Sequence, residues 1–234
     1  MAVPSSSGVL AFLRRHVWSL TLSGFSLLCF AQLASEVSEN ELTHFDHAVS
    51  IAVIHFRGAP DRLMLALTSL GSGDALTLVT AAVVGVLLAC GRRREAFYLV
   101  FCAVGSWLLN LGMKELFQRA RPDASYLIKM PSSFSFPSGH AMCSAGIFAS
   151  LAILARVLGG PRAWAYALVA LCFLVMMGIG VSRVYFGVHY ASDVLGGQLA
   201  SVALVSALTG WFYPRLLPGE HSTTTPAVNP VSGD

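Results

Sequence analysis

The sequence predicts an all-α membrane protein with six transmembrane helices. Of its 234 residues, 55% are hydrophobic and only 12% are charged. Soluble domains carry about 25% charged residues, which they need to cover a water-facing surface. In addition, the chain contains six mostly apolar stretches that approach the roughly 20 residues needed to cross a bilayer as a helix. Both observations place this chain in a membrane.

The six predicted spans, in chain order, are Val17–Ala34, Leu76–Cys90, Ala96–Met113, Ala141–Leu158, Ala163–Val181 and Val194–Phe212. The first follows Arg14 and Arg15, as the apolar part of a signal peptide would. It is long and lacks a clean small-x-small cleavage site, so we expect it to remain in the protein. The second is short. We expect it to begin upstream, near Leu63–Leu70, and to be interrupted at Gly71–Asp74, where Asp74 is a candidate helix cap.

Two segments outside the spans are polar. Residues His44–Gly58 mix apolar and polar side chains at near-helical spacing, which predicts an amphipathic helix in the membrane interface. Three histidines in it lack the further ligands of a zinc site. Residues 214–234 are polar and contain proline, so we expect a disordered cytoplasmic tail after a membrane domain of residues 1–213. The five cysteines lie in apolar stretches without metal-site spacing and are expected to be unpaired.

Lysine and arginine residues near the span ends predict the orientation. With six spans, the cations on the side of the N-terminus are Arg14, Arg15, Arg92, Arg93, Arg94, Arg156, Arg162 and Arg215, and those on the other side are Arg57, Arg62, Lys114, Arg119, Arg121, Lys129 and Arg183. These sets are nearly equal in number. The pair before the first span and the triplet at Arg92 favour cytoplasmic N- and C-termini. Cations near membrane ends on the other side need another reason to be there, and binding an anion would supply it.

Three polar clusters fall on the side opposite the termini. They are KELFQRARP (Lys114–Pro122), PSGH (Pro137–His140) and SRVYFGVHYASD (Ser182–Asp193). The first follows the third span, the second opens the fourth, and the last links the fifth to the sixth. Their convergence on one face indicates a functional site. The net charge of +3, without a basic run interleaved with aromatic residues, does not indicate nucleic-acid binding.

The first cluster suits an anion. Lys114 and Arg121 are seven residues apart and would share one face of a helix that ends before Pro122. Two cations at a helix end can hold an anion, and the planar guanidinium of arginine suits phosphate. The alternative is a pair of cations that extend to the lipid headgroups. Glu115 and Arg119 flank this clamp and are expected to pair only with solvent or headgroups.

The last cluster pairs an imidazole with a carboxylate. His189 and Asp193 are four residues apart and would be neighbours at a helix start. A carboxylate that holds one imidazole nitrogen fixes the tautomer and makes the other nitrogen a better nucleophile or base. Arg183, upstream, could add a further anion contact. The alternative is a simple surface hydrogen bond between histidine and aspartate.

The middle cluster stands where the fourth span begins. Pro137 and Gly139 could merely mark a helix start. However, the free backbone N–H groups and the dipole of a helix N-terminus also favour an anion. Gly139 has no side chain to block a ligand, Ser138 can donate its hydroxyl, and His140 can give or take a proton. Together the clusters could hold an anion, attack it and protonate what leaves, which phosphoryl transfer requires.

The three clusters resemble the motifs of the type 2 phosphatidic acid phosphatase superfamily, the lipid phosphate phosphatases: K-x6-R-P, P-S-G-H and S-R-x5-H-x3-D. All three match in order and without a substitution, which is a specific signal. The resemblance covers roughly residues 63–197, and the layout is most similar to the bacterial undecaprenyl-diphosphatase group. It implies a membrane phosphatase without metal or cofactor, acting on a lipid phosphate or diphosphate at the extracytoplasmic face of a bacterial inner membrane.

The resemblance also implies a role for each motif residue. His189 would be the nucleophile that forms a phosphohistidine, Asp193 would orient it, and His140 would be the general acid for the leaving group. The residues expected to bind the phosphate are Lys114, Arg121, Ser138, Gly139 and Arg183.

The expected substrate is undecaprenyl diphosphate, with phosphatidylglycerol phosphate, phosphatidic acid and lipid A as alternatives. Vanadium haloperoxidases share this anion cradle but are soluble, unlike so apolar a chain. A transporter or lipid-binding protein with an inactive pocket would also carry charges within the membrane. Such a pocket would be expected to have lost a catalytic residue, and none is missing here. The sequence leaves the oligomeric state open.

Overall fold

The computed structural model describes residues 6–123, 125–159 and 161–216, and side chains between residues 17 and 212. These residues form eight helices and no strand, which confirms the predicted all-α class. The helices are α1 (Ser6–Ser38), α2 (Thr43–Ile54), α3 (Asp61–Leu70), α4 (Gly73–Ala89), α5 (Arg93–Phe117), α6 (Gly139–Val157), α7 (Arg162–Tyr185) and α8 (Ala191–Leu216). The predicted tail lies almost entirely outside the described residues.

Five of these helices are long and apolar enough to cross a membrane: α1 from Val17, α5, α6, α7, and α8 as far as Phe212. A sixth span arises if α3 and α4 are one segment, bent by 59° at the break between them. The predicted interruption of the second span is therefore confirmed. Its cap differs from the prediction, because Ser72 accepts a hydrogen bond from the N–H of Ala75 while Asp74 lies exposed in the first turn of α4.

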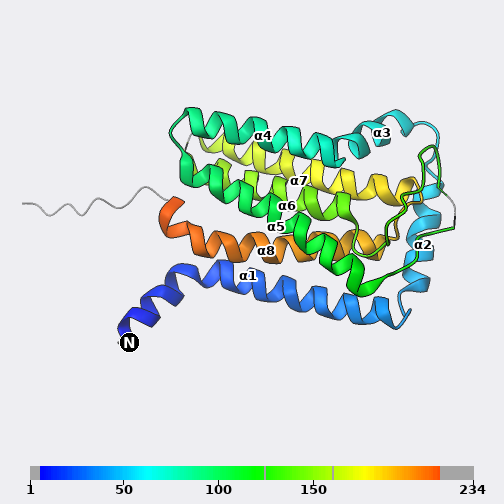
Figure 1. Cartoon of the computed structure of the whole chain (residues 1–234), viewed down its shortest axis with the longest axis horizontal. Coiled ribbons are helices and arrows are strands. Elements are labelled where there is room, and N and C mark those ends of the chain that lie inside the picture. The colour runs from blue at the N-terminus through cyan, green and yellow to red at the C-terminus, as the bar shows by residue number, and fades with distance from the viewer. Residues whose placement is uncertain (1–5, 124, 160, 217–234) are drawn as a thin grey trace, which may run out of the picture.

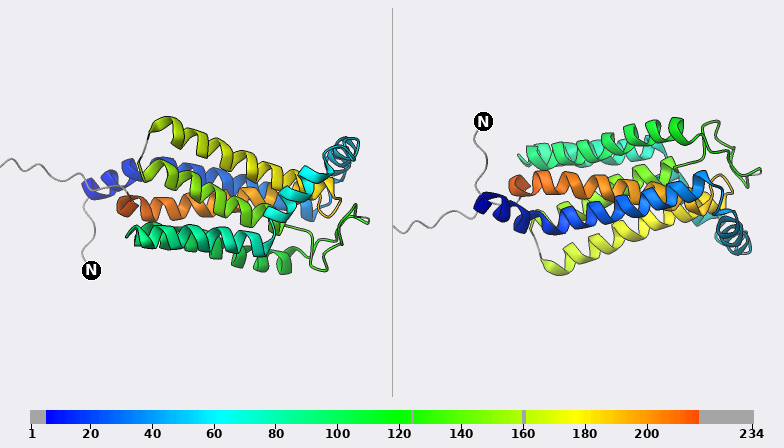
Figure 2. Two further views of the ribbon diagram at one scale, coloured as in Figure 1. Left: turned by 90° about the horizontal axis from the view of Figure 1, so that it is seen from above. Right: turned by 90° about the horizontal axis from the view of Figure 1, so that it is seen from below.

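The spans form one bundle, seen along its length in Figure 1. Helix α6 packs against α5, α7 and α8, while α1 runs beside α8 and α4 packs on α5. The short helix α2 lies across one end of the bundle, as the two views of Figure 2 also show. Helix α1 begins and α8 ends at the opposite end. The bundle therefore has one end covered by α2 and connecting loops, and one end that carries both terminal helices.

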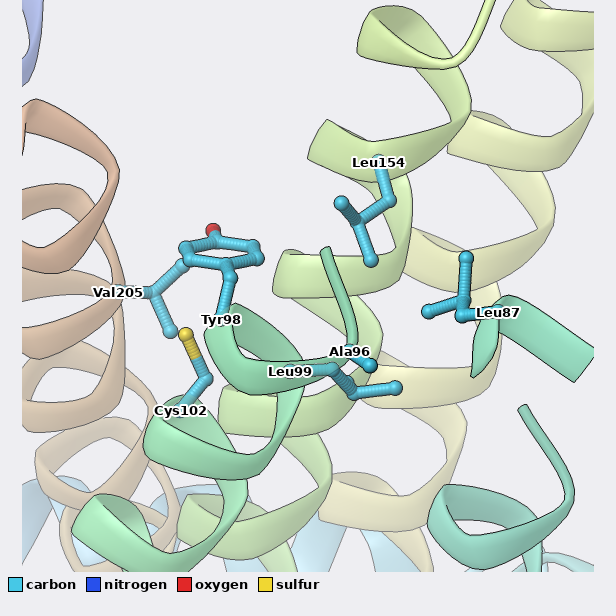
Figure 3. Packing of buried hydrophobic residues seen from close by; sticks show 7 residues of the cluster. All are labelled: Leu87, Ala96, Tyr98, Leu99, Cys102, Leu154 and Val205. Carbon is cyan, nitrogen blue, oxygen red and sulfur yellow. The ribbon is translucent and has the colours of Figure 1, made fainter. Parts of the chain in front are cut away.

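The end that carries the terminal helices has an apolar core (Figure 3). Its buried side chains are Leu87, Ala96, Tyr98, Leu99, Cys102, Leu154 and Val205. The hydroxyl of buried Tyr98 pairs with Thr209 Oγ1 at 2.8 Å, so that its polar atom is satisfied. All five cysteines are unpaired, as predicted. Burial of apolar side chains is the main stabilising contribution at this end.

Helix α2 confirms the expected helical segment between the first two spans. His44, His47 and His55 are all exposed. Val49 and Val53 of α2 pack against the ends of α6, α7 and α8. The one buried residue of α2 is a carboxylate, Asp46. This helix is thus fastened to the end of the bundle where the predicted polar clusters meet.

Candidate active site

All three predicted clusters meet at the end of the bundle covered by α2. Lys114 lies in the last turn of α5, and the loop that follows carries Arg121. Helix α6 begins at Gly139 with Ser138 as its N-cap, and the turn between α7 and α8 carries His189. Polar groups from four parts of the chain therefore come together at this end.

Helix α5 runs past the predicted span end at Met113 but stops at Phe117, short of the helix end before Pro122 that the sequence predicts. Gln118 adopts a left-handed conformation, with φ of 46°, and its N–H closes the last turn on the carbonyl of Lys114. A residue in this conformation ends a helix. Lys114 and Arg121 therefore do not share a helix face, contrary to the prediction. The loop, rather than the helical period, brings Arg121 back over the site.

Arg121 is held against the turn that carries His189. Its guanidinium donates to the backbone carbonyl of Val188 at 2.6 Å and to Nε2 of His189 at 3.0 Å. Three further donations fix it to the loop, to the carbonyl and the hydroxyl of Ser133 and to the carbonyl of Phe134. A guanidinium has only donors, so Nε2 of His189 is the acceptor in this contact. The ring proton of His189 is therefore on Nδ1.

Nδ1 of His189 faces the carboxylate of Asp193. The distance from Nδ1 to Oδ2 is 3.3 Å, and both side chains are buried. The same Oδ2 accepts from the hydroxyl of Ser135 at 2.5 Å and from the backbone N–H of Tyr190 at 2.9 Å. The i, i+4 pair predicted from the sequence is thus formed, but it is buried and further hydrogen-bonded rather than a surface contact.

Burial is the largest influence on His189 and lowers its pKa to about 4, although the hydrogen bond and charge of Asp193 act in the opposite direction. The charges of Arg121 and Arg183 lower this pKa further. The imidazole is consequently neutral near pH 7. A neutral ring with its proton on Nδ1 has a free electron pair on Nε2, which is the form required of a nucleophile.

Two buried donors at the site have no hydrogen-bond partner among the described residues: the hydroxyl of Ser138 and Nε of Arg183. Arg183 is only 4% exposed, and Nη1 of its guanidinium donates to the hydroxyl of Thr68. Leaving such groups unpaired costs about 1–3 kcal/mol each, more for a charge. An anion that accepts from both would remove this cost.

Ser138 does not use its hydroxyl to cap α6. The first N–H groups of a helix have no partner within it, so the start of α6 offers backbone donors beside this hydroxyl. Gly139 has a different role from the one expected. A Cβ there would lie 3.0 Å from Oδ1 of Asn110, so the missing side chain makes room for α5 rather than for a ligand. Nδ2 of Asn110 in turn donates to the carbonyl of Pro137 at 3.1 Å.

His140 lies in the first turn of α6. Charges of Arg183, His189, Arg121 and Lys114 all act on its ring. The break between α3 and α4 touches the same ring, because a Cβ on Gly71 would come within 3.1 Å of Cδ2 of His140. The structure therefore brings the two predicted histidines into one site with the three predicted cations. Lys114 is buried there and donates to the carbonyl of Phe134.

Sequence reasoning missed two residues behind this site. Arg119, expected to pair only with solvent or headgroups, instead bridges two buried carboxylates, Asp193 at 2.6 Å and Asp46 at 2.8 Å. Asp46 lies 73 residues before Arg119, in a helix that the sequence marks only as amphipathic. No local spacing could have indicated this pair.

An apolar cavity of about 540 Å³ lies between α4, α5 and α6. Leu76, Val104, Trp107 and Ile147 contribute to its walls, and Cys143, one turn after His140, lines it as well. The cavity lies within the spanning segments and approaches the site along α6. Its chemistry suits a hydrocarbon chain.

Comparison with known proteins identifies the family of this chain. The model of the PAP2 superfamily matches residues 95–216. The chain belongs to the PAP2 superfamily. Phosphatidylglycerophosphatase B of Bacillus subtilis (strain 168) is 32% identical over 187 residues, which span 79% of this chain and 91% of that protein. The decaprenylphosphoryl-5-phosphoribose phosphatase of Mycobacterium tuberculosis is 31% identical over 130 residues, spanning 54% of this chain and 66% of that one.

A solved structure shares the fold as well. The crystal structure of a transmembrane PAP2 type phosphatidylglycerolphosphate phosphatase from Bacillus subtilis superposes with a TM-score of 0.75 at 28% identity, covering 82% of this chain and 96% of that one. The family resemblance predicted from the three motifs, and the membrane fold predicted from the composition and the apolar stretches, are therefore confirmed. This PAP2 chain is an integral membrane protein and a phosphatase of the lipid phosphatase group.

Proposed function

We propose that this PAP2 phosphatase hydrolyses its lipid substrate without a metal ion, through a phosphohistidine on His189. The observation that carries the proposal is the state of that ring. It is buried and neutral, its proton lies on Nδ1 toward Asp193, and Nε2 receives a donation from Arg121. Substrate binding would move this donor from Nε2 to a phosphate oxygen, which frees the electron pair for attack.

In the first step, Nε2 of His189 bonds to phosphorus while the bond to the lipid oxygen breaks. His140, at the start of α6, gives a proton to that oxygen. In the second step, His140 takes a proton from water, which attacks the phosphohistidine and releases inorganic phosphate. Asp193 stabilises the charge that develops on His189 in both steps.

The phosphate would be held by the cations and donors around it. The proposed binding residues are Lys114, Arg121, Ser138, Gly139 and Arg183, with Gly139 contributing its backbone N–H. The unpartnered donors of Ser138 and Arg183 support this assignment. Charge neutralisation and positioning account for most of the catalysis in phosphoryl transfer.

For the substrate, we propose phosphatidylglycerol phosphate first, because the B. subtilis relative that bears this activity in its name matches over 91% of its length. Undecaprenyl diphosphate, which the sequence favoured, is the second candidate. A relative named for a decaprenyl-linked substrate supports it, since such a substrate also carries a polyprenyl chain. The apolar cavity beside α6 would accept part of either chain.

We further propose that the site opens on the extracytoplasmic side of a bacterial inner membrane. The start of α1 and the end of α8 lie at the end of the bundle away from the site. The arginine triplet Arg92–Arg94, at the start of α5, lies at that same end. By the positive-inside rule this end is cytoplasmic.

The test is phosphate release by the purified full chain in detergent, with EDTA present, from four lipids: phosphatidylglycerol phosphate, undecaprenyl diphosphate, phosphatidic acid and lipid A. We expect turnover of one of the first two lipids, unchanged by EDTA. Release from none of the four would refute the proposed lipid phosphatase function. Activity that disappears in EDTA and returns with a divalent ion would instead refute the metal-free mechanism.

A further inference from the structure

We propose that Asp46 and Arg119 are positioning residues for the phosphatase reaction, forming a charged relay from α2 through Arg119 to Asp193 that holds the carboxylate against His189. This inference rests on the proposed function of His189. Asp46 lies outside the three clusters that indicated the site, and Arg119 stands between Lys114 and Arg121 at a position that the first motif leaves open.

The two oxygens of the Asp193 carboxylate have different partners in the relay. Oδ1 accepts from Nη1 of Arg119 at 2.6 Å, while Oδ2 faces Nδ1 of His189 at 3.3 Å. A carboxylate held at one oxygen by a charged donor cannot rotate freely, so the other oxygen keeps its direction. The orientation of His189 thus depends on Arg119 as well as on Asp193.

Arg119 is fixed in turn from α2. Its Nη2 donates to Oδ2 of Asp46 at 2.8 Å, and its guanidinium lies 4.3 Å from the ring centre of Tyr190. The backbone N–H and the hydroxyl of Ser192, in the first turn of α8, donate to Asp46 at 2.8 and 2.6 Å. The same hydroxyl lies 2.7 Å from Nη1 of Arg119. A buried carboxylate on α2 therefore joins the guanidinium to the helix that carries Asp193.

The relay contains one positive group, Arg119, and two negative groups, Asp46 and Asp193, so removing either Arg119 or Asp46 changes the charge that acts on His189. One guanidinium serves two carboxylates. Burial opposes the charge of Arg119, yet Asp193 and Asp46 raise its pKa above the ordinary value, so it stays a cation. If Arg119 is lost, Asp193 faces His189 uncompensated and favours its protonation. If Asp46 is lost, Arg119 acts on Asp193 alone and disfavours that protonation.

Other charges also face His189 and stay constant in this comparison. They are Asp193 from α8, Arg183 from α7, His140 from α6 and Arg121 from the loop, while Lys114 from α5 acts on the Asp193 carboxylate. Since a protonated His189 cannot attack phosphorus, activity falls as the pH drops through its pKa. The acidic limb of the pH profile therefore reports the charge of the relay. Titration of the substrate itself is common to all variants and cancels between them.

The experiment compares Arg119→Gln, Arg119→Lys and Asp46→Asn in the full chain in detergent, using the lipid with the highest turnover. Arg156→Gln is the matched control, because Arg156 also stacks on a tyrosine at 4.3 Å but lies at the far end of α6. We expect Arg119→Gln to lower kcat about 10- to 100-fold with little change in KM, as for other residues that orient a reacting ligand. Arg119→Lys should recover part of this loss.

The acidic limb of the pH profile shows whether Arg119 and Asp46 position His189 or only support the fold. We expect it to move to higher pH in Arg119→Gln, to lower pH in Asp46→Asn, and not at all in Arg156→Gln. The relay is refuted if Arg119→Gln and Asp46→Asn lose activity while the acidic limbs of their pH profiles stay where they are in the wild type. It is also refuted if both of these variants keep the kcat of the wild type. If Arg119→Gln does not fold, Asp46→Asn alone decides by the direction of its shift.

Failure of this inference is distinguishable from failure of the proposed function. A wild-type protein that releases no phosphate from any lipid contradicts the function itself. A wild type that turns over, with relay variants that behave like Arg156→Gln, contradicts only the relay.

Discussion

The two ends of the bundle are built from the same helices but are held together in different ways. At the end with the terminal helices, α5, α6 and α8 contribute Leu99, Leu154 and Val205 to an apolar core. At the other end, the same three helices contribute Lys114, His140 and Asp193. The first end is stabilised by burial of apolar surface, and the second adds hydrogen bonds between charged groups to such burial.

Each of these helices therefore contributes to the stability of the fold at one end and to the chemistry of the site at the other. A buried charge costs free energy unless partners satisfy it, so the polar end needs a full set of partners from α2, the loop and α7. The apolar end needs only complementary volumes. Substitutions at the two ends should therefore change different observables, and the following predictions test that separation.

The largest effect is expected at His189. His189→Ala removes the proposed nucleophile and should lower turnover by about three orders of magnitude or more, with no acid-labile phosphoenzyme trapped from radiolabelled substrate. His55→Ala, which removes an exposed imidazole of the same end, should leave both measurements unchanged. Labelled phosphate trapped on His189→Ala would assign the nucleophile to another residue.

A smaller loss is expected at Arg183. Arg183→Gln removes a buried cation with an unpartnered Nε and should lower kcat/KM about 10²- to 10³-fold, because a preorganised charge donor is lost from the transition state. Inhibition by vanadate should weaken in parallel. Arg62→Gln, an exposed cation on α3, serves as the control. Vanadate inhibition equal in both variants would count against a role of Arg183 in holding the anion.

The smallest effect on turnover is expected at the apolar end. Leu154→Ala creates a cavity beside Tyr98 and Leu99 and should lower the free energy of unfolding by about 2–5 kcal/mol. The kcat of the folded protein should not change. The control is Leu168→Ala at an exposed position of α7, which should leave thermal unfolding in detergent nearly unchanged. A large fall in kcat without a fall in Tm would show that the two ends are not separable.

Much of this arrangement could be predicted from local patterns. Apolar runs gave the spans, and the break at Gly71–Asp74 predicted the bend between α3 and α4. Motif spacing gave His189 with Asp193 and placed His140 at a helix start. Each of these signals is contained within a few turns of chain, where side-chain period and helix-ending residues act directly.

The parts that could not be predicted depend on distant partners or on single backbone angles. Arg119 finds Asp46 across 73 residues, and nothing near either residue indicates the other. Gln118 ends α5 by adopting a left-handed conformation that glutamine rarely takes, so the helix appeared to continue to Arg121. Gly139 suggested room for a ligand, but only the packed helices show that Asn110 occupies that side.

The position of the terminal helices has a practical consequence. Helix α1 begins and α8 ends at the end of the bundle away from His189. A fluorescent reporter or a surface tether attached beyond either helix would therefore be separated from the reacting groups by the full thickness of the bilayer. Protein immobilised in this way would present its catalytic end to the bulk solution, where a hydrophilic inhibitor or an antibody fragment could reach it without crossing lipid.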